Sequence, residues 1–476
     1  MTQIFNVVEE IQNKMNSEPQ LPGKKDNSIS FESLIEQVKE HFDDFFKDDS
    51  NDSKKKQDRL NLYHKAVIGD KETEILLTNE IDSYLRSINV NNIPYPEYYQ
   101  SLAQALFHEI YRFGILHKWY VMEDSPAAKF TGNEFWIERN DVFEKQKEVL
   151  PHKDSVREFI QRFMAGQKNL KVNESNPYAE IALADKTRVT IIIPPASYKP
   201  TLIFRKYTVK NLNFEQQAER GTIPKSDVDF YKVFSRLYFN TIVAGHIKSG
   251  KSTFLKSIYG AREPEKVAVL IEDEAETFLK QDFPNRLVHE LYTHNQDVNQ
   301  TIRRALRIDH DFLIVQEVRG IEAEGAIGGT ERGRKGLLMS YHITDPENTS
   351  IQLSQHIVDE YPNRHQVNEI RRISKSLDIG VTMESKNGQK RVTSMYEIGI
   401  EKTNNQPFIN YLIYFNPKTN KWEYNSDVSR ELIVRMDDTN PELSHRFIQH
   451  LQEQTKLNPM SKKARHPIYL GSFKEE

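Results

Sequence analysis

The residues with the clearest chemistry lie in one glycine-rich run near the middle of the chain. This run reads GHIKSGKS from Gly245 to Ser252, fits the pattern G-x-x-x-x-G-K-S, and follows the apolar segment 241–244. Glycine lets a backbone turn tightly enough to aim consecutive N–H groups at a phosphate, and a following helix adds its N-terminal dipole. The sequence therefore predicts a phosphate-binding loop, against the alternative of a glycine-rich surface turn.

The side chains of this loop have separate expected roles. Lys251 is expected to reach the β- and γ-phosphates of a nucleotide, and the Ser252 hydroxyl is expected to bind Mg²⁺. The other predicted nucleotide contacts come from the rest of the loop and the first helical turn: Gly245, Lys248, Ser249, Gly250 and Thr253. The predicted ligand is ATP with Mg²⁺, and GTP is the alternative because no base-binding motif is recognisable.

Hydrolysis of a triphosphate also needs a residue that orients water, and Glu317 is the predicted one. The apolar run 312–315 is followed by Gln316, Glu317, Val318 and Arg319. The tip of a buried parallel strand lies at the carboxyl edge of its sheet, beside a phosphate loop. Glu317 is therefore predicted to serve catalysis and Mg²⁺ binding, with a simple ion pair to Arg319 as the alternative.

Two further groups are expected at the same sheet edge. The acidic cluster 272–276 follows the strand-like run 267–271, and it supplies Glu272 as a predicted catalytic residue and Asp273 as a predicted Mg²⁺ ligand. A helix N-terminus with favourable dipole charges is the alternative reading of this cluster. His342 follows the strand-like run 337–341 and suits sensing a phosphate or a carboxylate, although a lone histidine there is usually structural.

Composition limits the function classes. A length of 476 residues suggests two or three domains, and a net charge of −4 gives no global attraction to nucleic acid, so no direct nucleic-acid binding is expected. The absence of cysteine excludes disulfides and cysteine-ligated zinc. The N-terminus lacks the pattern of a signal peptide, and the apolar runs are only strand-sized. We therefore expect a cytoplasmic protein without an integral membrane segment, peripheral at the cytoplasmic face of the membrane through partners.

Changes in pattern along the chain predict the domain organisation. The predicted segments are a helical N-terminal extension (1–95), a smaller α/β domain (96–210), a linker (211–237), an α/β domain with a parallel central sheet (238–445) and a C-terminal tail (446–476). The parallel sheet is predicted because strand-like runs alternate there with helix-length segments. Antiparallel strands are expected at 381–383, 391–400 and 408–415, with a hairpin turn at Asn387 and Gly388.

The order of these segments resembles a known family, the secretion and conjugation traffic ATPases, which drive type II and type IV secretion, type IV pili and tight-adherence (Tad) pili. Residues 271–276 resemble the family's Asp box, 316–320 its second nucleotide motif and 339–342 its His box. The segments 185–189, 194–195 and 202–206 extend the similarity upstream. The Tad-pilus and conjugation-type branch is the most similar, because the Glu-Val-Arg-Gly run at 317–320 occurs together with an Ile-Arg-Lys-like segment. Extension pilus and type II motors often carry a four-cysteine zinc insertion, which this cysteine-free chain cannot form.

The resemblance implies a fold and further site residues. It implies a RecA-like P-loop ATPase domain preceded by a PAS-like N-terminal domain, assembled as a homohexamer. It also implies that Arg188 and Arg205 contact the phosphates from the N-terminal domain, and that Arg319 and His342 belong to the catalytic set. The alternative is that both arginines are ordinary exposed residues of strands. Gln316 departs from the Mg²⁺-linked aspartate that many nucleotide hydrolases have at this position.

We therefore expect a hexameric Mg²⁺-dependent ATPase that powers a type IV secretion, conjugation or Tad-like pilus machine with inner-membrane partners. One alternative is an ATP-binding regulator or scaffold with little turnover. A second alternative is a nucleic-acid translocating P-loop motor, against which the near-neutral charge argues.

Overall fold

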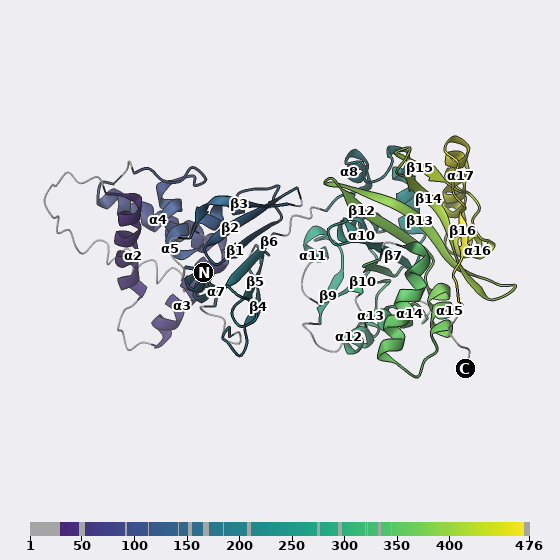
Figure 1. The fold of residues 1–476 in the computed structure, drawn as a ribbon, viewed down its shortest axis with the longest axis horizontal. Helices are drawn as coiled ribbons and strands as arrows, with labels where there is room; N and C mark the ends of the chain where they lie inside the picture. Colours follow the sequence, from purple (N-terminus) through teal and green to yellow (C-terminus); the bar gives the residue numbers. More distant parts are fainter. Residues whose placement is uncertain are drawn as a thin grey trace. The chain divides into compact units, whose positions relative to one another are not determined.

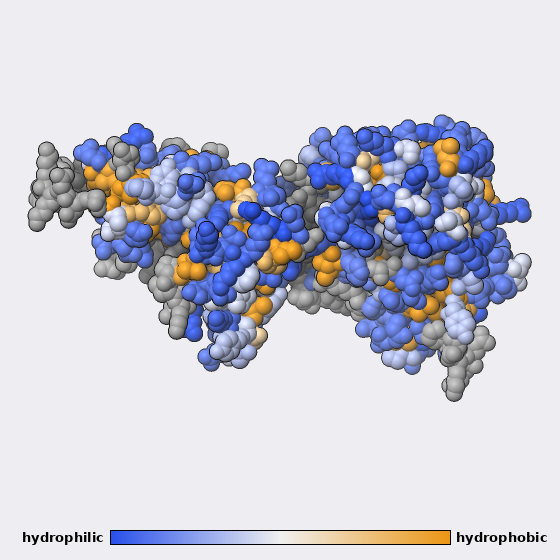
Figure 2. All heavy atoms as spheres, turned by 45° about the horizontal axis from the view of Figure 1, so that its top comes forward, coloured by the Kyte–Doolittle hydropathy of each residue, from blue (hydrophilic) through white to orange (hydrophobic). Residues whose placement is uncertain are grey.

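A computed structural model describes residues 29–46, 53–90, 93–112, 114–140, 142–150, 155–164, 171–183, 185–206, 211–273, 277–293, 298–318, 320, 322–331, 335–343 and 345–470. The chain divides into two compact units, Met1–Thr208 and Val209–Glu476 (Figure 1). On the face drawn in Figure 2, hydrophilic residues predominate and apolar residues form small separate patches. Within the described ranges, no helix is long and apolar enough to cross a membrane.

The first part of the N-terminal unit is helical. Its elements are α2 (Phe31–Phe46), α3 (Ser53–Ile68), α4 (Lys71–Ser87), α5 (Leu102–Tyr111), the 3-10 turn η1 (Gly114–Leu116) and α6 (His117–Tyr120). In α2, Leu34, Val38 and Phe42 are buried and recur every fourth residue, so they share one face of the helix. That face joins α4 and α5 in one apolar core, which explains why this polar stretch folds as helices.

The rest of the N-terminal unit is an antiparallel sheet with the strand order β3-β2-β1-β6-β5-β4. Its strands are β1 (Ala127–Thr131), β2 (Glu134–Arg139), β3 (Val142–Val149), β4 (Tyr178–Ala182), β5 (Arg188–Ile192) and β6 (Thr201–Arg205), and α7 (Ser155–Met164) follows β3. Val189 and Phe204 lie in the core with Phe163 of α7. Because side chains alternate along a strand, Arg188 and Arg205 lie on the opposite face of the sheet.

The C-terminal unit is built on one mixed sheet. The strands are β7 (Thr241–Gly245), β8 (Ala268–Glu272), β9 (Val288–Tyr292), β10 (Phe312–Val318), β11 (Leu338–Tyr341), β12 (Ile379–Lys386), β13 (Gln389–Glu401), β14 (Gln406–Asn416), β15 (Lys421–Tyr424) and β16 (Arg465–Pro467). The strands β9-β8-β10-β11-β7-β12 run parallel in this order. Strands β13 to β16 continue the sheet in antiparallel fashion. The predicted α/β fold with a parallel central sheet is confirmed.

Helices cover both faces of this sheet. They are α8 (Phe214–Glu219), the turn η2 (Lys225–Asp227), α9 (Val228–Arg236), α10 (Lys251–Gly260), α11 (Leu279–Asp282), α12 (Val298–Ala305), α13 (Glu322–Thr330), the turn η3 (Pro346–Asn348), α14 (Thr349–Glu360), α15 (Gln366–Ser376), α16 (Arg430–Thr439) and α17 (Pro441–Leu457). Val243 of β7 lies in one apolar core, whereas Ile242 and Ala244 lie in another. A strand that is buried on both faces reads as an uninterrupted apolar run, which is the pattern of 241–244.

The stretch expected as a linker folds as part of the C-terminal unit. Phe214, Phe230 and Phe234 from α8 and α9 are buried in the core that contains the β7 and α10 side chains. The amphipathic pattern of this stretch therefore reflects packing onto the sheet, with buried residues such as Phe230 next to exposed ones such as Asp229.

The stretch expected as a C-terminal tail also differs from expectation. The boundary at 445 falls inside α17, whose Phe447 and Leu451 are buried. Farther along, β16 pairs with β14, and the Ile468 N–H donates to the Pro407 carbonyl at 2.8 Å. Burial of α17 side chains and the pairing of β16 with β14 therefore make this stretch part of the C-terminal unit.

One buried carboxylate connects the two unexpected stretches. Asp227, at the end of η2, accepts a hydrogen bond from the Tyr424 hydroxyl at 2.8 Å and contacts His450 Nε2 of α17 at 3.1 Å. Its side chain is fully buried. Removing the carboxylate would leave the Tyr424 hydroxyl buried and without its acceptor.

We expect Asp227→Ala to loosen the attachment of α17. The loss should be about 2 kcal/mol of local opening free energy, because a buried donor is left unsatisfied. Hydrogen exchange of α17 amides in the full chain measures it. The control is Asp229→Ala, since Asp229 is two residues away and largely exposed; equal exchange rates in both variants would contradict the role of Asp227.

Candidate nucleotide site

The loop after β7 has the backbone geometry of a phosphate-binding loop. Strand β7 ends at Gly245 and α10 begins at Lys251, so the predicted strand–loop–helix order is present. Gly245 and Gly250 have φ values of +149° and +99°, which side chains with a Cβ rarely adopt. A Cβ on Gly245 would also stand 2.2 Å from the carbonyl oxygen of Met383 in β12. Sterics therefore explain why glycine occupies this position.

Lys251 lies inside the curve of this loop. Its ammonium donates hydrogen bonds to the carbonyl oxygens of Gly245 and His246, both at 2.9 Å. Burial lowers the pKa of Lys251 to about 8, and the negative charge of Glu317 opposes that shift. The loop therefore holds a cation that can transfer its hydrogen bonds to phosphate oxygens.

Ser252 contacts a residue of β10 that the sequence pattern did not assign to the site. The Gln316 amide donates from Nε2 to the Ser252 hydroxyl oxygen at 2.7 Å. The other amide atom, Gln316 Oε1, is buried and has no hydrogen-bond partner within the described residues. Gln316 thus lies next to the Ser252 hydroxyl, at the position where many nucleotide hydrolases have an aspartate.

Glu317 and His342 meet at the carboxyl edge of the sheet. Nε2 of His342 is in close contact with Oε1 of Glu317, and Nδ1 of His342 lies 3.4 Å from the Lys251 ammonium. An ammonium can only donate hydrogen bonds and a carboxylate can only accept them. A neutral imidazole that carries its proton on Nε2 satisfies both neighbours. The three side chains therefore form one continuous polar chain beside the loop.

A β-bulge in β10 directs these side chains. Val315 pairs with Met339 and Val318 pairs with Tyr341, so Gln316 and Glu317 together face the single residue Ser340 of β11. Glu317 has a φ of +58°, and its N–H donates to the Ser340 hydroxyl at 3.0 Å. Bulges re-aim side chains and are frequent next to active sites. Strict alternation would have sent Gln316 and Glu317 to opposite faces of the sheet.

The two acidic residues after β8 are held by threonines. Glu272 is buried and accepts hydrogen bonds from the N–H and the hydroxyl of Thr277, at 3.0 and 2.7 Å. Asp273 accepts from the Thr293 hydroxyl at 2.7 Å. These bonds anchor both carboxylates to the chain that follows β8 and β9. Their catalytic and metal-binding roles stay predictions, and residues 274–276 of the cluster lie outside the described residues.

The described residues fit a hydrated Mg²⁺ ion better than a fully coordinated metal. No group of three or more His, Asp or Glu side chains in the described ranges is arranged to hold a metal. Mg²⁺ usually keeps several waters and takes one or two side-chain ligands beside substrate phosphates. The Ser252 hydroxyl would ligate it, and the unpartnered Gln316 Oε1 would accept a hydrogen bond from one of its waters.

The remaining loop residues line up along the turn. Lys248 has a φ of +65°, Ser249 and Thr253 are buried, and the Ser249 N–H donates to the His246 carbonyl at 3.2 Å. Their nucleotide contacts stay predictions, as does the catalytic role of Arg319, which lies outside the described residues.

The two predicted arginines of the N-terminal unit lie side by side. Arg188 begins β5 and Arg205 ends β6, and the two residues are directly opposite each other in the antiparallel pair. Glu180 of β4 lies 3.9 Å from Arg188 and offsets part of the repulsion. Like charges directly opposite each other on a sheet repel, and this pair therefore lowers the stability of the sheet to the extent that neighbouring groups do not offset it.

The chain is similar to known proteins over most of the candidate nucleotide site. Residues 127–404 match the family described as Type II/IV secretion system protein, which is more than half of the chain. The VirB11 type IV secretion system proteins of Bartonella quintana and Bartonella henselae are 24% and 23% identical over 226 residues, covering 39% of this chain and 63% of each relative. The chain thus spans less than two thirds of these relatives. A solved structure of the VirB11 ATPase from Brucella suis is 20% identical with a TM-score of 0.34, covering 59% of this chain and 92% of that one.

The pKa of Lys251 predicts how nucleotide affinity depends on pH. Bound phosphates favour the ammonium, so affinity should be constant below about pH 8 and fall by up to about tenfold per pH unit above it. Titration of a fluorescent ATP analogue between pH 7.5 and 9.5 measures this. In Lys251→Arg the guanidinium stays charged, so weaker but pH-independent binding is expected. A flat curve for the unmodified protein would contradict the assignment.

Proposed function

Because the chain belongs to the Type II/IV secretion system protein family, we propose that it is a Mg²⁺-dependent ATPase whose hydrolysis drives a type IV secretion, conjugation or Tad-like pilus machine. The observation that carries the proposal is the convergence of Lys251, Glu317 and His342 at the end of the phosphate-binding loop. A phosphate-binding loop alone supports nucleotide binding, whereas a carboxylate held beside it supports hydrolysis.

In this proposal, each residue has its own role in hydrolysis. Lys251 transfers its hydrogen bonds from the loop carbonyls to the β- and γ-phosphates. His342 contacts Oε1 of Glu317 and positions this carboxylate, which accepts a hydrogen bond from the attacking water. Water attacks the γ-phosphorus, the bond to the β–γ bridging oxygen breaks, and ADP and phosphate leave. Bound Mg²⁺ supplies positive charge at the phosphate oxygens.

The N-terminal unit is proposed to contribute further positive charge at the nucleotide phosphates. Arg188 and Arg205 form a pair of like charges on one sheet face, and a guanidinium can neutralise charge on a transferring phosphoryl group. Binding of a nucleotide phosphate would relieve the repulsion between them. Contact of both arginines with the nucleotide phosphates is therefore part of this proposal.

The proposal extends to assembly and location. We propose a homohexamer at the cytoplasmic face of the membrane, in contact with inner-membrane components of its machine. The support for this extension is the family description of a secretion system protein and the traffic-ATPase motifs.

Glu317→Gln is expected to separate binding from hydrolysis. Turnover should fall on the order of a hundredfold or more, because the amide is a poor acceptor for the water proton, while ATP affinity stays nearly unchanged. A phosphate-release assay and an ATP titration of the same preparation measure the two effects. The matched control is Glu360→Gln, at an exposed carboxylate at the end of α14.

The same experiment distinguishes the rival functions. If the unmodified chain turns over no faster than Glu317→Gln, the regulator or scaffold reading replaces the motor. If single-stranded or duplex DNA stimulates turnover severalfold, the nucleic-acid motor replaces it.

Arg205→Gln tests the contribution of the N-terminal unit. Turnover should fall on the order of a hundredfold, while the thermal unfolding midpoint stays equal or rises, because a like-charge pair is removed. The control is Lys199→Gln, since Lys199 is an exposed cation in the connection at the other end of β5 and β6. Unchanged turnover in Arg205→Gln would remove this arginine from the site.

A further inference from the structure

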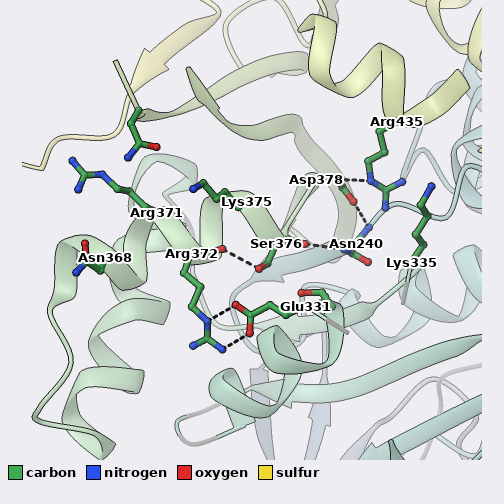
Figure 3. Close-up of a pocket in the computed structure, with 12 residues that line it drawn as sticks. Asn240, Glu331, Lys335, Asn368, Arg371, Arg372, Lys375, Ser376, Asp378 and Arg435 are labelled. Atoms are coloured by element: carbon green, nitrogen blue, oxygen red, sulfur yellow. Dashed lines mark hydrogen bonds and ion pairs between the residues drawn. The ribbon is translucent and has the colours of Figure 1, made fainter. Parts of the chain in front are cut away.

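A second concave site lies at the opposite edge of the sheet from the phosphate-binding loop. This basic pocket has a volume of about 750 Å³ and is lined by Asn240, Thr330, Glu331, Lys335, Asn368, Arg371, Arg372, Lys375, Ser376, Asp378, Asn405 and Arg435 (Figure 3). Asn240 directly precedes β7, whereas Gly245 ends it. Five strand residues span about 17 Å, so the basic pocket and the nucleotide site are separate.

Internal ion pairs account for two of the five cations in the basic pocket. Arg372 of α15 binds Glu331 at 2.6 Å and also pairs with Glu324 and Glu369. Arg435 of α16 binds Asp378 at 2.6 Å. Asp378 in turn accepts from the Asn240 N–H at 2.7 Å, and Asn240 Nδ2 donates to the Ser376 carbonyl at 2.8 Å. These contacts join α15 and α16 to the starts of β7 and β12, which explains their presence without any ligand.

The other three cations have no such explanation. Lys335, Arg371 and Lys375 have no ion-pair partner among the described residues, and both carboxylates that line the pocket are bound to the other arginines. Arg371 and Lys375 lie one turn apart on α15 and project together from it (Figure 3). Arg371 Nε is buried and has no hydrogen-bond acceptor in the described part of the chain. The lining therefore carries a surplus of three positive charges around a hollow.

The chemistry of the lining limits what it can bind. All twelve lining side chains are polar or charged. Pockets for ordinary organic ligands are mostly apolar, and the centre of a protein–protein interface is depleted of charge. Three unpaired cations in a small hollow instead match an anion with several charges, and arginine and lysine are the residues that bind phosphate groups.

We propose that the basic pocket binds a small anion that carries two or more phosphate groups, either as a soluble molecule or as a lipid headgroup. The site is independent of ATP hydrolysis, because it lies at the other sheet edge and shares no residue with the nucleotide site. Arg371 and Lys375 from α15 and Lys335 from the segment before β11 supply the charge, and Asn240, Asn368 and Asn405 supply further hydrogen bonds.

Inorganic pyrophosphate is the first probe, measured by titration calorimetry on the full chain. The Lys251→Ala background weakens binding at the phosphate-binding loop, so that the remaining signal reports the basic pocket. We expect one pyrophosphate to bind per chain. The affinity should be about tenfold weaker in R371A and in K375A, and about a hundredfold weaker in the double variant. The matched control is K418A with K421A, which removes two exposed charges from the β14–β15 turn.

The outcomes decide the proposal. Equal affinity in the double variant and its control would overturn it, as would the absence of binding. If the double variant no longer shows a cooperative thermal unfolding transition, the single variant K375Q is the test, because it removes the charge of an exposed side chain and keeps a polar group there. Unchanged affinity in K375Q would then overturn the role of Lys375.

Two further arms identify the source of the anion. The first arm is cosedimentation with vesicles of cardiolipin and phosphatidylcholine. A lipid headgroup is identified if the unmodified chain cosediments with these vesicles, R371A/K375A does not, and vesicles of phosphatidylcholine alone bind neither. Pyrophosphate binding without vesicle binding identifies a soluble anion. Hexaglutamate peptide is the final probe. If it binds as tightly as pyrophosphate, and R371A/K375A loses this binding, the ligand is an acidic polypeptide and the phosphate assignment is overturned.

Discussion

The extra residue in β10 is the constraint on which the nucleotide site depends. Because Gln316 and Glu317 together oppose Ser340, one side chain reaches the Ser252 hydroxyl and the other reaches His342. A regular ladder would bring only one of the two residues to this edge. The Ser340 hydroxyl accepts the Glu317 N–H, which the irregular ladder leaves without a regular partner. The bulge, rather than the loop alone, combines phosphate binding with a carboxylate and a histidine.

Much of the site could be predicted because its parts end consecutive parallel strands. The loop after β7, Glu317 near the end of β10 and His342 after β11 were assigned from apolar runs followed by polar residues. The contact between Gln316 and Ser252 was not predicted, because it requires the bulge, and nothing in a single sequence marks a one-residue register shift. The anchoring of Glu272 by Thr277 was likewise missed, since an acidic cluster does not reveal which carboxylate is buried.

The fold was predictable where the apolar pattern was continuous and less so elsewhere. The parallel strands and the hairpin at Asn387 and Gly388, both at positive φ, follow the expected pattern. Residues 211–237 and 446–470 resembled connecting segments because their buried side chains are spaced apart by polar ones. Their membership in the C-terminal unit depends on long-range contacts such as Asp227 with Tyr424. Contacts between residues far apart in the chain are the part of the fold that local patterns do not contain.

The left-handed backbone conformation of Glu317 lowers the stability of the fold at the position that carries the carboxylate. A residue with a Cβ in this conformation costs about 1 kcal/mol, and the cost is absent for glycine and reduced for asparagine. Replacement of Glu317 by glycine would therefore relieve the backbone strain and would at the same time remove the carboxylate that contacts His342. Stabilised variants of this protein should consequently be sought away from the end of β10.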